Sequence, residues 1–308
     1  MVRIVKWKSR LSAVILLPTA LIALTFSAHL NFLDGWRHWI AVWPLSLFFY
    51  LAGAELHWEF REGFFTDRKK ALVVCGAVIG GMATPALIYL FGAGVTHASP
   101  GAWGVPMATD LPLVLAALSF LPNRQISQLR PFLLALAITD DIGSVLVLSI
   151  GFHQAISPSL IAALLGALAP TALQGIHEKV LTPIVNYLVI PLFILSALSV
   201  KLDLSWGGVG SKVSLSLIIA RLIGKPLGIF LGASLIAYLL KIQPPLNKRN
   251  LFMAGALASL GLSVSLLFAS ISLNGSDQNN AIVGTIVSIP LALIASAIAY
   301  FLTRETAA

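Results

Sequence analysis

The chain is divided into ten long apolar runs, each bounded by charged residues or by breaks rich in glycine, proline and asparagine. The runs are residues 11–29, 38–55, 71–92, 106–121, 130–152, 158–174, 183–200, 213–240, 251–273 and 281–302. A helix needs about 20 apolar residues to cross a bilayer. A membrane β-barrel would instead show short segments of alternating polarity, and these runs do not. We therefore predict an all-α polytopic membrane protein of about ten transmembrane helices, forming one integral membrane domain over residues 1–308.

The composition excludes several functional classes. Of the 308 residues, 58% are hydrophobic and only 10% are charged, whereas a soluble domain has about 25% charged residues. Despite the net charge of +8, almost no chain remains for a soluble domain, so we expect the lipid bilayer as a partner and no nucleic acid. The single cysteine, Cys75, excludes an intrachain disulfide and a multi-cysteine metal site. We expect no cofactor.

The lysines and arginines predict the orientation. If the N-terminus is cytoplasmic, fifteen of the twenty fall in cytoplasmic loops and tails, and only Arg37, Lys201 and Lys212 fall on the opposite side. Cytoplasmic loops carry the excess of these residues, so we expect both termini in the cytoplasm. In the alternative interpretation, the basic start and the first apolar run form a signal peptide. That run is long and its cleavage site is poorly formed.

Five charged residues lie inside the predicted spans: Asp110, Asp140, Asp141, Arg221 and Lys225. A charge at the bilayer centre costs about 2.5–3.5 kcal/mol on insertion scales, so it usually faces a cavity and has a partner. Together these residues predict a hydrated polar centre. In the purely structural alternative they pair only to hold helices together, but two adjacent carboxylates exceed what such a pair requires.

The paired carboxylates indicate cation and proton exchange. Asp140 and Asp141 leave their helix about 100° apart, so one can face a cavity while the other faces a neighbouring helix. A buried carboxylate can hold either H⁺ or a hard cation such as Na⁺, which prefers oxygen ligands. Arg221 and Lys225 are four residues apart, on one helix face. We expect Lys225 to take part in proton exchange and Arg221 to act as a fixed charge.

Two of the runs have the features of interrupted helices. The run 106–121 carries Pro106, Thr109, Asp110 and Pro112, and proline disturbs a helix and removes a backbone donor. The run 251–273 is rich in glycine and serine, which also mark ordinary tight helix packing. One interrupted segment in each half points to the transport site of an inverted-repeat transporter.

These segments resemble the NhaA family of bacterial sodium/proton antiporters. The resemblance is carried by residues 104–110 (Gly-Val-Pro-Met-Ala-Thr-Asp), 136–143 (Leu-Ala-Ile-Thr-Asp-Asp-Ile-Gly) and 222–229 (Leu-Ile-Gly-Lys-Pro-Leu-Gly-Ile). Residues 51–56 and 190–193 are similar to further family segments. It implies an inverted-repeat fold whose two interrupted helices cross near the midplane. It also implies a secondary transporter in the cell inner membrane that exchanges Na⁺ or Li⁺ for H⁺ and is not an enzyme.

The resemblance also implies roles for individual residues. Asp141 is the principal carrier of the transported Na⁺ and of the proton, and Asp140 is its partner, exchanging a salt bridge with Lys225. Asp110 and Thr109 lie where the interrupted helices cross. Three acidic residues match positions near the family's cytoplasmic funnel and are candidate modulators, although solvated charges at helix ends would look the same: Glu55, Glu59 and Glu178.

The chain also departs from the family pattern. Family members typically have twelve helices, and two central helices are predicted to be missing before residues 157–170. Lys179 and Thr182 stand where the family has histidines, which puts its usual pH sensing in doubt. Arg221 replaces a small residue and is expected to compete for Asp140, so its removal should be tolerated. The turn 31–36 is too short for the family's dimerising β-hairpin, so a homodimer should be weaker than usual.

Two other functions share part of this pattern. An intramembrane aspartyl protease needs carboxylates from separate helices, in Tyr-Asp and Gly-x-Gly-Asp contexts that this sequence lacks. A shortened, non-transporting homologue with a structural or regulatory role is the more serious rival. A salt bridge from Arg221 to an aspartate, closing the site, would distinguish it.

Overall fold

The computed structural model describes residues 37–61, 64–151, 161–162, 165–166, 177–198 and 206–304, and every regular element in them is helical. The α-helices are α2 (Arg37–Arg61), α3 (Arg68–Thr96), α4 (Leu111–Leu118), α5 (Asn123–Gly151), α8 (Thr182–Ile184), α9 (Ile190–Leu198), α10 (Trp206–Val209), α11 (Lys212–Ile219), α12 (Lys225–Leu239), α13 (Lys248–Ala258), α14 (Ser263–Ser272) and α15 (Gly275–Arg304). Short 3₁₀ helices are η2 (Phe64–Thr66) and η3 (Pro100–Met107), and π-helical turns are η5 (His177–Leu181), η6 (Val185–Val189) and η7 (Ala220–Gly224).

The long apolar helices confirm an all-α polytopic membrane protein. Within the described ranges, four continuous helices are long and apolar enough to cross a membrane: Arg68–Thr96, Arg124–Leu148, Lys212–Leu239 and Gly275–Phe301. Two bent pairs, η3 with α4 and α13 with α14, raise this number to six. Helix α2 and the η5–α9 segment correspond to two more of the predicted runs. The run 11–29 and most of 158–174 lie outside the described residues, so ten spans remains a prediction.

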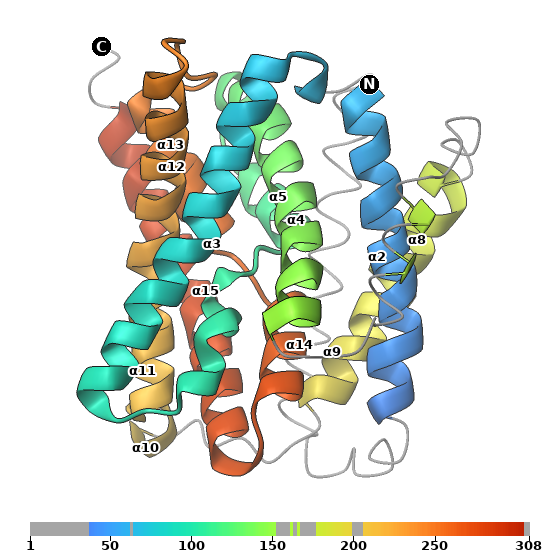
Figure 1. Cartoon of the computed structure of the whole chain (residues 1–308), viewed down its shortest axis with the longest axis vertical. Coiled ribbons are helices and arrows are strands. Elements are labelled where there is room, and N and C mark those ends of the chain that lie inside the picture. The colour runs from blue at the N-terminus through green and yellow to red at the C-terminus, as the bar shows by residue number, and fades with distance from the viewer. Residues whose placement is uncertain are drawn as a thin grey trace.

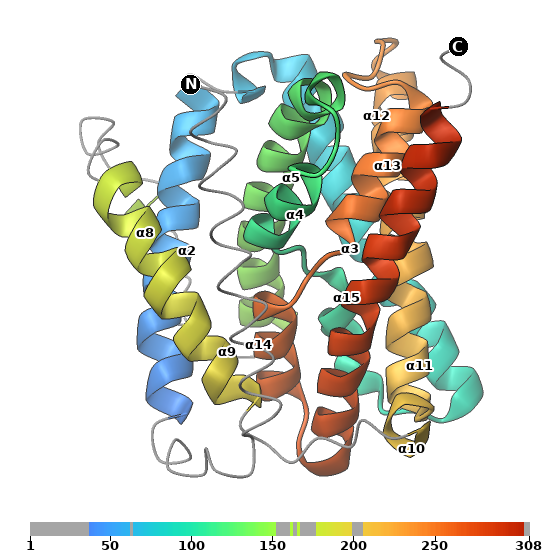
Figure 2. The same cartoon turned by 180° about the vertical axis from the view of Figure 1, so that it is seen from behind.

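The helices form two units that run in opposite directions (Figures 1 and 2). Helix α3 descends in Figure 1, η3 and α4 ascend, and α5 descends. In the second unit α11 and α12 ascend, α13 and α14 descend, and α15 ascends. Helices α2 and α9 pack against each other and flank these units on one side. The arrangement is that of an inverted repeat, as the pair of interrupted segments predicted.

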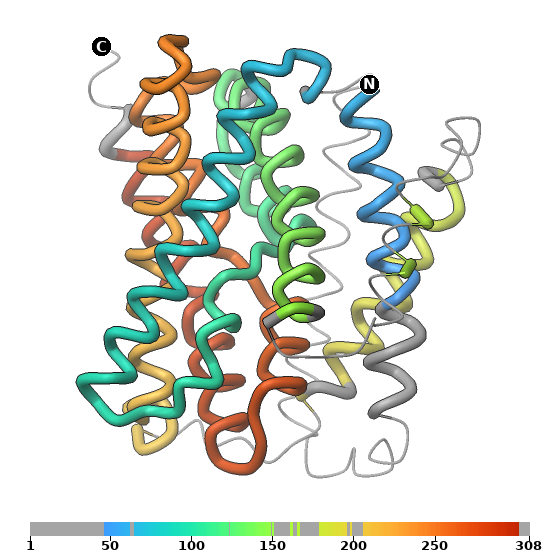
Figure 3. The backbone as a smooth tube through the Cα atoms, viewed as in Figure 1, coloured from blue at the N-terminus to red at the C-terminus, as the bar shows by residue number. Residues whose placement is uncertain are grey.

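Each unit contains one broken span, and the two breaks meet at mid-height (Figure 3). The bend is 45° between η3 and α4 and 55° between α13 and α14. The first broken span begins at Pro100, upstream of the predicted start at residue 106, because residues 100–107 form a 3₁₀ helix. The sequence in this stretch alternates glycine and proline with apolar residues, so it lacks the period by which an α-helix is recognised.

The two units pack closely through α3 and α12. At their crossing, a Cβ atom added to Gly228 would lie 2.1 Å from the carbonyl oxygen of Gly80, and one added to Gly80 would lie 2.1 Å from that of Gly228. Only glycine permits this approach, because any side chain at either position would overlap the facing backbone. The backbones of the two units are therefore in direct contact.

Basic residues gather at the helix ends that are uppermost in Figure 1. Helix α2 ends there, α3, α5 and α13 begin there, and α12 and α15 end there. These ends carry Arg61, Arg68, Lys69, Lys70, Arg124, Lys241, Lys248, Arg249 and Arg304. At the opposite end, α2 begins with Arg37 and α11 with Lys212. The charge asymmetry deduced from the sequence is thus an asymmetry between the two ends of the bundle.

Candidate cation and proton site

The two breaks are joined directly through their backbones. The Asp110 amide donates a hydrogen bond to the carbonyl oxygen of Leu260 at 2.8 Å. Gly261 lies so close to the other break that a Cβ atom there would be 2.2 Å from the carbonyl oxygen of Ala108. A helix that ends inside a bundle has free N–H or C=O groups at its end, and these groups need hydrogen-bond partners. The crossing brings four such ends together.

Thr109 and Asp110 cap both helix ends at the opposite break. The Thr109 hydroxyl donates to the carbonyl oxygen of Ala258, the last residue of α13, at 2.9 Å. The Asp110 Oδ2 atom accepts from the amide of Ser263, the first residue of α14, at 3.1 Å and from its hydroxyl at 2.7 Å. A carboxylate is stabilised beside a helix N-terminus, which carries partial positive charge. Both side chains are buried, as their predicted place at the crossing requires.

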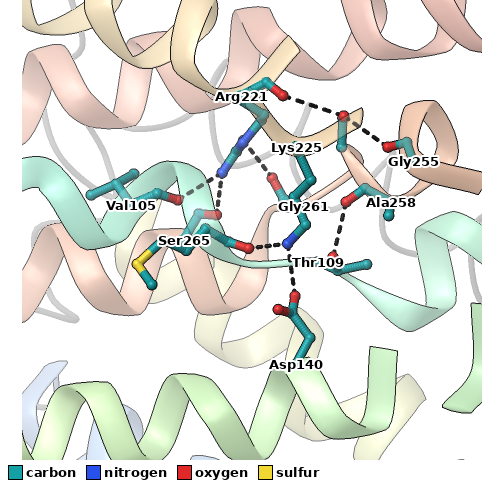
Figure 4. A network of polar contacts seen from close by, with 11 residues as sticks. Val105, Thr109, Asp140, Arg221, Lys225, Gly255, Ala258, Gly261 and Ser265 are labelled. Carbon is teal, nitrogen blue, oxygen red and sulfur yellow. Dashed lines mark hydrogen bonds and ion pairs between the residues drawn. The ribbon is translucent and has the colours of Figure 1, made fainter. Parts of the chain in front are cut away.

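Two cations from the second unit hold the carbonyl end of η3 (Figure 4). Arg221 donates to the carbonyl oxygen of Val105 at 2.9 Å, and Lys225 donates to that of Met107. Both acceptors lie near the C-terminal end of η3, where partial negative charge accumulates. The prediction that Arg221 and Lys225 share a helix face is confirmed, although Arg221 lies in the π-helical turn η7 rather than in regular α-helix.

Arg221 is fully buried and bridges three elements. Beyond η3, it donates to the Gly261 carbonyl oxygen at the second break at 2.9 Å, to the Ser288 hydroxyl of α15 at 2.8 Å, and to the hydroxyl of Ser265. None of its hydrogen bonds goes to a carboxylate. Its two terminal amino groups are taken by carbonyl and hydroxyl oxygens of the crossing, and its Nε atom is buried without a hydrogen-bond partner. In this structure Asp140 is therefore paired with Lys225 and not with Arg221, contrary to the expected competition.

Lys225 forms a buried ion pair with Asp140. The distance from Nζ to Oδ2 is 2.8 Å, and the exposed fractions of the side chains are 1% and 2%. This pair connects α12 of the second unit to α5 of the first (Figure 4). Removing one partner of such a pair leaves an uncompensated buried charge, so the two groups depend on each other.

Asp141 differs from its neighbour in having no such partner. It is 5% exposed, and among the described residues no hydrogen bond or ion pair reaches its carboxylate. Asp140, Asp110 and Glu55 lie near enough to act on it electrostatically. The Oδ1 atom of Asp110 is likewise buried without a hydrogen-bond partner. Buried carboxylate oxygens that lack protein partners are suited to hold a proton or a cation.

The three predicted glutamates lie on α2 and on η5. Glu55 and Glu59 are one turn apart on α2; Glu55 is half-buried and acts electrostatically on Asp141, and Glu59 is buried. Glu178 belongs to the π-helical turn η5, and its side chain lies outside the described part. Glu55 thus acts on one of the paired aspartates, as a modulator of the site would.

The structure brings together all five intramembrane charges and Thr109, and it adds partners that the sequence did not identify. The sequence marks Ser263 and Ser265 only as members of the glycine- and serine-rich run 251–273, and it gives no signal for Ser288. Ser263 could have been recognised as a hydroxyl directly after a helix break, where capping partners are common. Ser288 lies within an unbroken apolar helix and gives no comparable signal.

The sequence that forms this site matches a known protein family. The profile of the family described as Na⁺/H⁺ antiporter 1 matches residues 12–178 and 170–302. The chain belongs to this family. The two matched stretches overlap at residues 170–178, so the profile is followed as two segments rather than as one.

Two named bacterial proteins are similar to this chain along most of its length. A protein of Yersinia enterocolitica named Na⁺/H⁺ antiporter NhaA is 29% identical over 293 residues, covering 78% of this chain and 75% of that protein. A protein of the same name from Yersinia pseudotuberculosis is also 29% identical over 293 residues, covering 78% of this chain and 74% of its own.

Proposed function

We propose that this chain exchanges Na⁺ or Li⁺ for H⁺ across the bacterial inner membrane, with Asp140 and Asp141 as the exchanging carboxylates. Family membership and the names of the relatives support the exchange itself. The observation that carries the assignment is the Asp141 carboxylate, which is buried beside the ion-paired Asp140 and lacks a partner among the described residues. The protein is accordingly a secondary transporter rather than an enzyme.

Competition at Asp141 couples the two ions. With Na⁺ bound, the added positive charge favours ionisation of both carboxylates, and with the cation gone protons replace it. Because the site does not hold Na⁺ and the exchanged protons together, movement of one ion inward requires movement of the other outward. Rocking of one unit against its surroundings would expose the site to the two sides in turn.

Lys225 can compensate the negative charge of Asp140 in place of a proton. While Asp140 is ionised, the ammonium group of Lys225 compensates its charge at 2.8 Å. If the bridge opens, Lys225 keeps the Met107 carbonyl oxygen as an acceptor. We infer that this second contact lets the bridge open without leaving the ammonium group unpaired. Arg221 stays a fixed charge that stabilises the crossing, because arginine does not deprotonate in proteins.

The rival assignment, a homologue that does not transport, is disfavoured by Arg221. It was distinguished by a salt bridge from this arginine to an aspartate, closing the site. In the described part the guanidinium hydrogen-bonds to backbone carbonyls and to serine hydroxyls instead. Asp141 is thereby left available for a transported ion.

The proposal includes the orientation and the assembly state. Both termini are placed in the cytoplasm, because the basic helix ends lie at one end of the bundle and cytoplasmic loops carry the excess of lysine and arginine. A homodimer, if formed, is proposed to be weaker than is usual for the family, because the turn 31–36 is short. Residues 31–36 lie outside the described part, and mass measurement in mild detergent at nanomolar concentration tests the dimer.

Transport of ²²Na⁺ into proteoliposomes with an outward proton gradient imposed tests the function. The wild-type protein is expected to take up ²²Na⁺, and Asp141→Asn is expected to abolish uptake. Asp277→Asn, which removes a carboxylate in the first turn of α15, is the matched control and should transport normally. Lys225→Ala should keep some cation binding but change the dependence on membrane potential, because the partner of Asp140 is gone. Wild-type uptake by Asp141→Asn would refute the assignment.

A further inference from the structure

Ser144, on α5, is a buried hydroxyl without a partner. It is 1% exposed, and its Oγ atom makes no hydrogen bond. Other hydroxyls in the helices donate to the carbonyl oxygen one turn earlier, as Thr139 does to Ala135 at 2.8 Å and Thr285 does to Ala281 at 2.9 Å. Buried polar side chains are nearly always hydrogen-bonded, so an exception calls for an explanation.

The position of Ser144 on α5 places it beside the paired aspartates. At about 100° per residue, it lies about 40° around the helix from Asp140 and about 60° from Asp141, between the two. It is about 6 Å further along the axis than Asp140 and about 4.5 Å further than Asp141. Gly143 faces a different neighbour, since a Cβ atom there would be 2.8 Å from the sulfur of Met82 on α3. The arc that carries Ser144 is thus the one that carries both carboxylates.

A cation held at Asp141 needs neutral oxygen ligands. Among the residues that the structure describes, no three acidic, histidine or cysteine side chains are grouped closely enough to hold a metal ion. Hard cations are coordinated by hydroxyl, carbonyl and water oxygens as well as by carboxylates. A serine hydroxyl has two lone pairs for a cation, and its rotating O–H can donate to a carboxyl group instead.

We propose that the Ser144 hydroxyl is a ligand of the transported cation, acting beside the Asp141 carboxylate. This inference rests on the proposed function and adds a residue to its site. The same hydroxyl serves both occupants: its oxygen contacts the cation, and its O–H group turns to the carboxyl when a proton replaces the cation. Ser144 is thereby a determinant of cation affinity and has no part in holding the helices together.

Direct binding to the purified protein separates this role from transport. Isothermal titration with Na⁺ in detergent, at a fixed pH, is applied to the wild type, Ser144→Ala, Ser144→Thr and Asp141→Asn. Loss of one polar ligand is expected to weaken Na⁺ binding about fivefold in Ser144→Ala, and the KM for ²²Na⁺ uptake should rise by a similar factor. Ser144→Thr keeps the hydroxyl and should bind within about twofold of the wild type.

Ser296→Ala is the matched control. Ser296 is buried in α15, and its hydroxyl donates to the Ala292 carbonyl oxygen at 2.7 Å, so this variant should bind Na⁺ normally. The midpoint of thermal unfolding in Ser144→Ala should stay at or above the wild-type value, because no hydrogen bond is lost. A fall in that midpoint with unchanged Na⁺ affinity would assign Ser144 a structural role and overturn the proposal.

The two proposals fail in different ways. If Asp141→Asn abolishes Na⁺ binding while Ser144→Ala binds as the wild type does, the ligand role of Ser144 is wrong and the exchange site stands. If the wild type binds no Na⁺, the proposed function is refuted, and the role of Ser144 with it. Loss of affinity in Ser144→Ala together with its recovery in Ser144→Thr is the result expected here.

Discussion

The carboxylate of Asp110 accepts two hydrogen bonds from Ser263, a residue 153 positions later in the chain. Asp110 precedes α4 but makes no side-chain cap there. It caps α14 of the opposite unit instead. The helix ends at the crossing are therefore stabilised in trans between the two units, so neither broken span is complete without the other.

This cross-capping predicts a specific loss of stability. Ser263→Ala removes the hydroxyl bond to Asp110 but keeps the amide bond, and loss of a capping interaction costs about 0.5–2 kcal/mol. Ser270→Ala, in the same helix, removes only a hydroxyl bonded to the Leu266 carbonyl oxygen within α14. Thermal unfolding in detergent should show a lower midpoint for Ser263→Ala than for Ser270→Ala. Equal midpoints would contradict the role of the cap.

Removal of Arg221 should destabilise the protein strongly. Arg221→Ala leaves the carbonyl oxygens of Val105 and Gly261 without their donor, and each buried group left unsatisfied costs about 1–3 kcal/mol. This reverses the expectation from sequence that the change is tolerated. Arg221→Lys keeps the charge, so its stability should lie between that of the wild type and that of Arg221→Ala. Temperature-dependent loss of the monodisperse peak in size-exclusion chromatography is a suitable measurement; an unchanged profile for Arg221→Ala would argue against this scaffold role.

The close approach of the breaks makes Gly261 irreplaceable. In Gly261→Ala the new Cβ would lie 2.2 Å from the Ala108 carbonyl oxygen, so the breaks must separate. The bond from Asp110 to Leu260 should weaken with them, and both stability and Na⁺ uptake should fall. The control is Gly94→Ala in α3, where nothing lies within 4 Å of the added atom. That change should be neutral or stabilising by about 0.5–1 kcal/mol, because alanine favours helix.

The orientation is open to cysteine labelling. In a Cys75→Ala background, Ser276→Cys lies at the start of α15, at the end of the bundle that is poor in basic residues. We expect a membrane-impermeant thiol reagent to modify it from the external side. Lys241→Cys, at the basic end, should react only after the cytoplasmic face is made accessible. Modification of Ser276→Cys from the cytoplasmic side alone would invert the topology.

Charges in apolar runs were sufficient to locate the site from the sequence. Asp110, Asp140 and Lys225 stand out because a charged group within a span requires a partner, and the structure shows each of them buried with one. The broken helices were likewise marked by Pro106 and by the glycine and serine residues of the later run. These signals are local, and local signals are readable from one sequence.

The partners themselves were beyond the reach of the sequence. Arg221 looked like a competitor for Asp140, since charge alone suggests a carboxylate partner. Its terminal amino groups in fact donate to serine hydroxyls and to two carbonyl groups, which become available because η3 and α13 end inside the bundle. The sequence likewise gives no sign that Ser144 is unusual. A serine in a helix normally hydrogen-bonds to its own backbone, and only the structure shows that the Ser144 hydroxyl does not.

The contact between Gly80 and Gly228 sets a limit on which parts of the protein can move. At that point backbone lies against backbone with no side chain between, so α3 and α12 cannot slide past each other there without overlap. Helices can slide more easily where side chains meet and can repack, and α5 and α14 contact α2 and α9 along a second boundary. Relative movement within the protein should therefore take place at that boundary. Asp140, Asp141, Arg221 and Lys225 should then move together as parts of one rigid body.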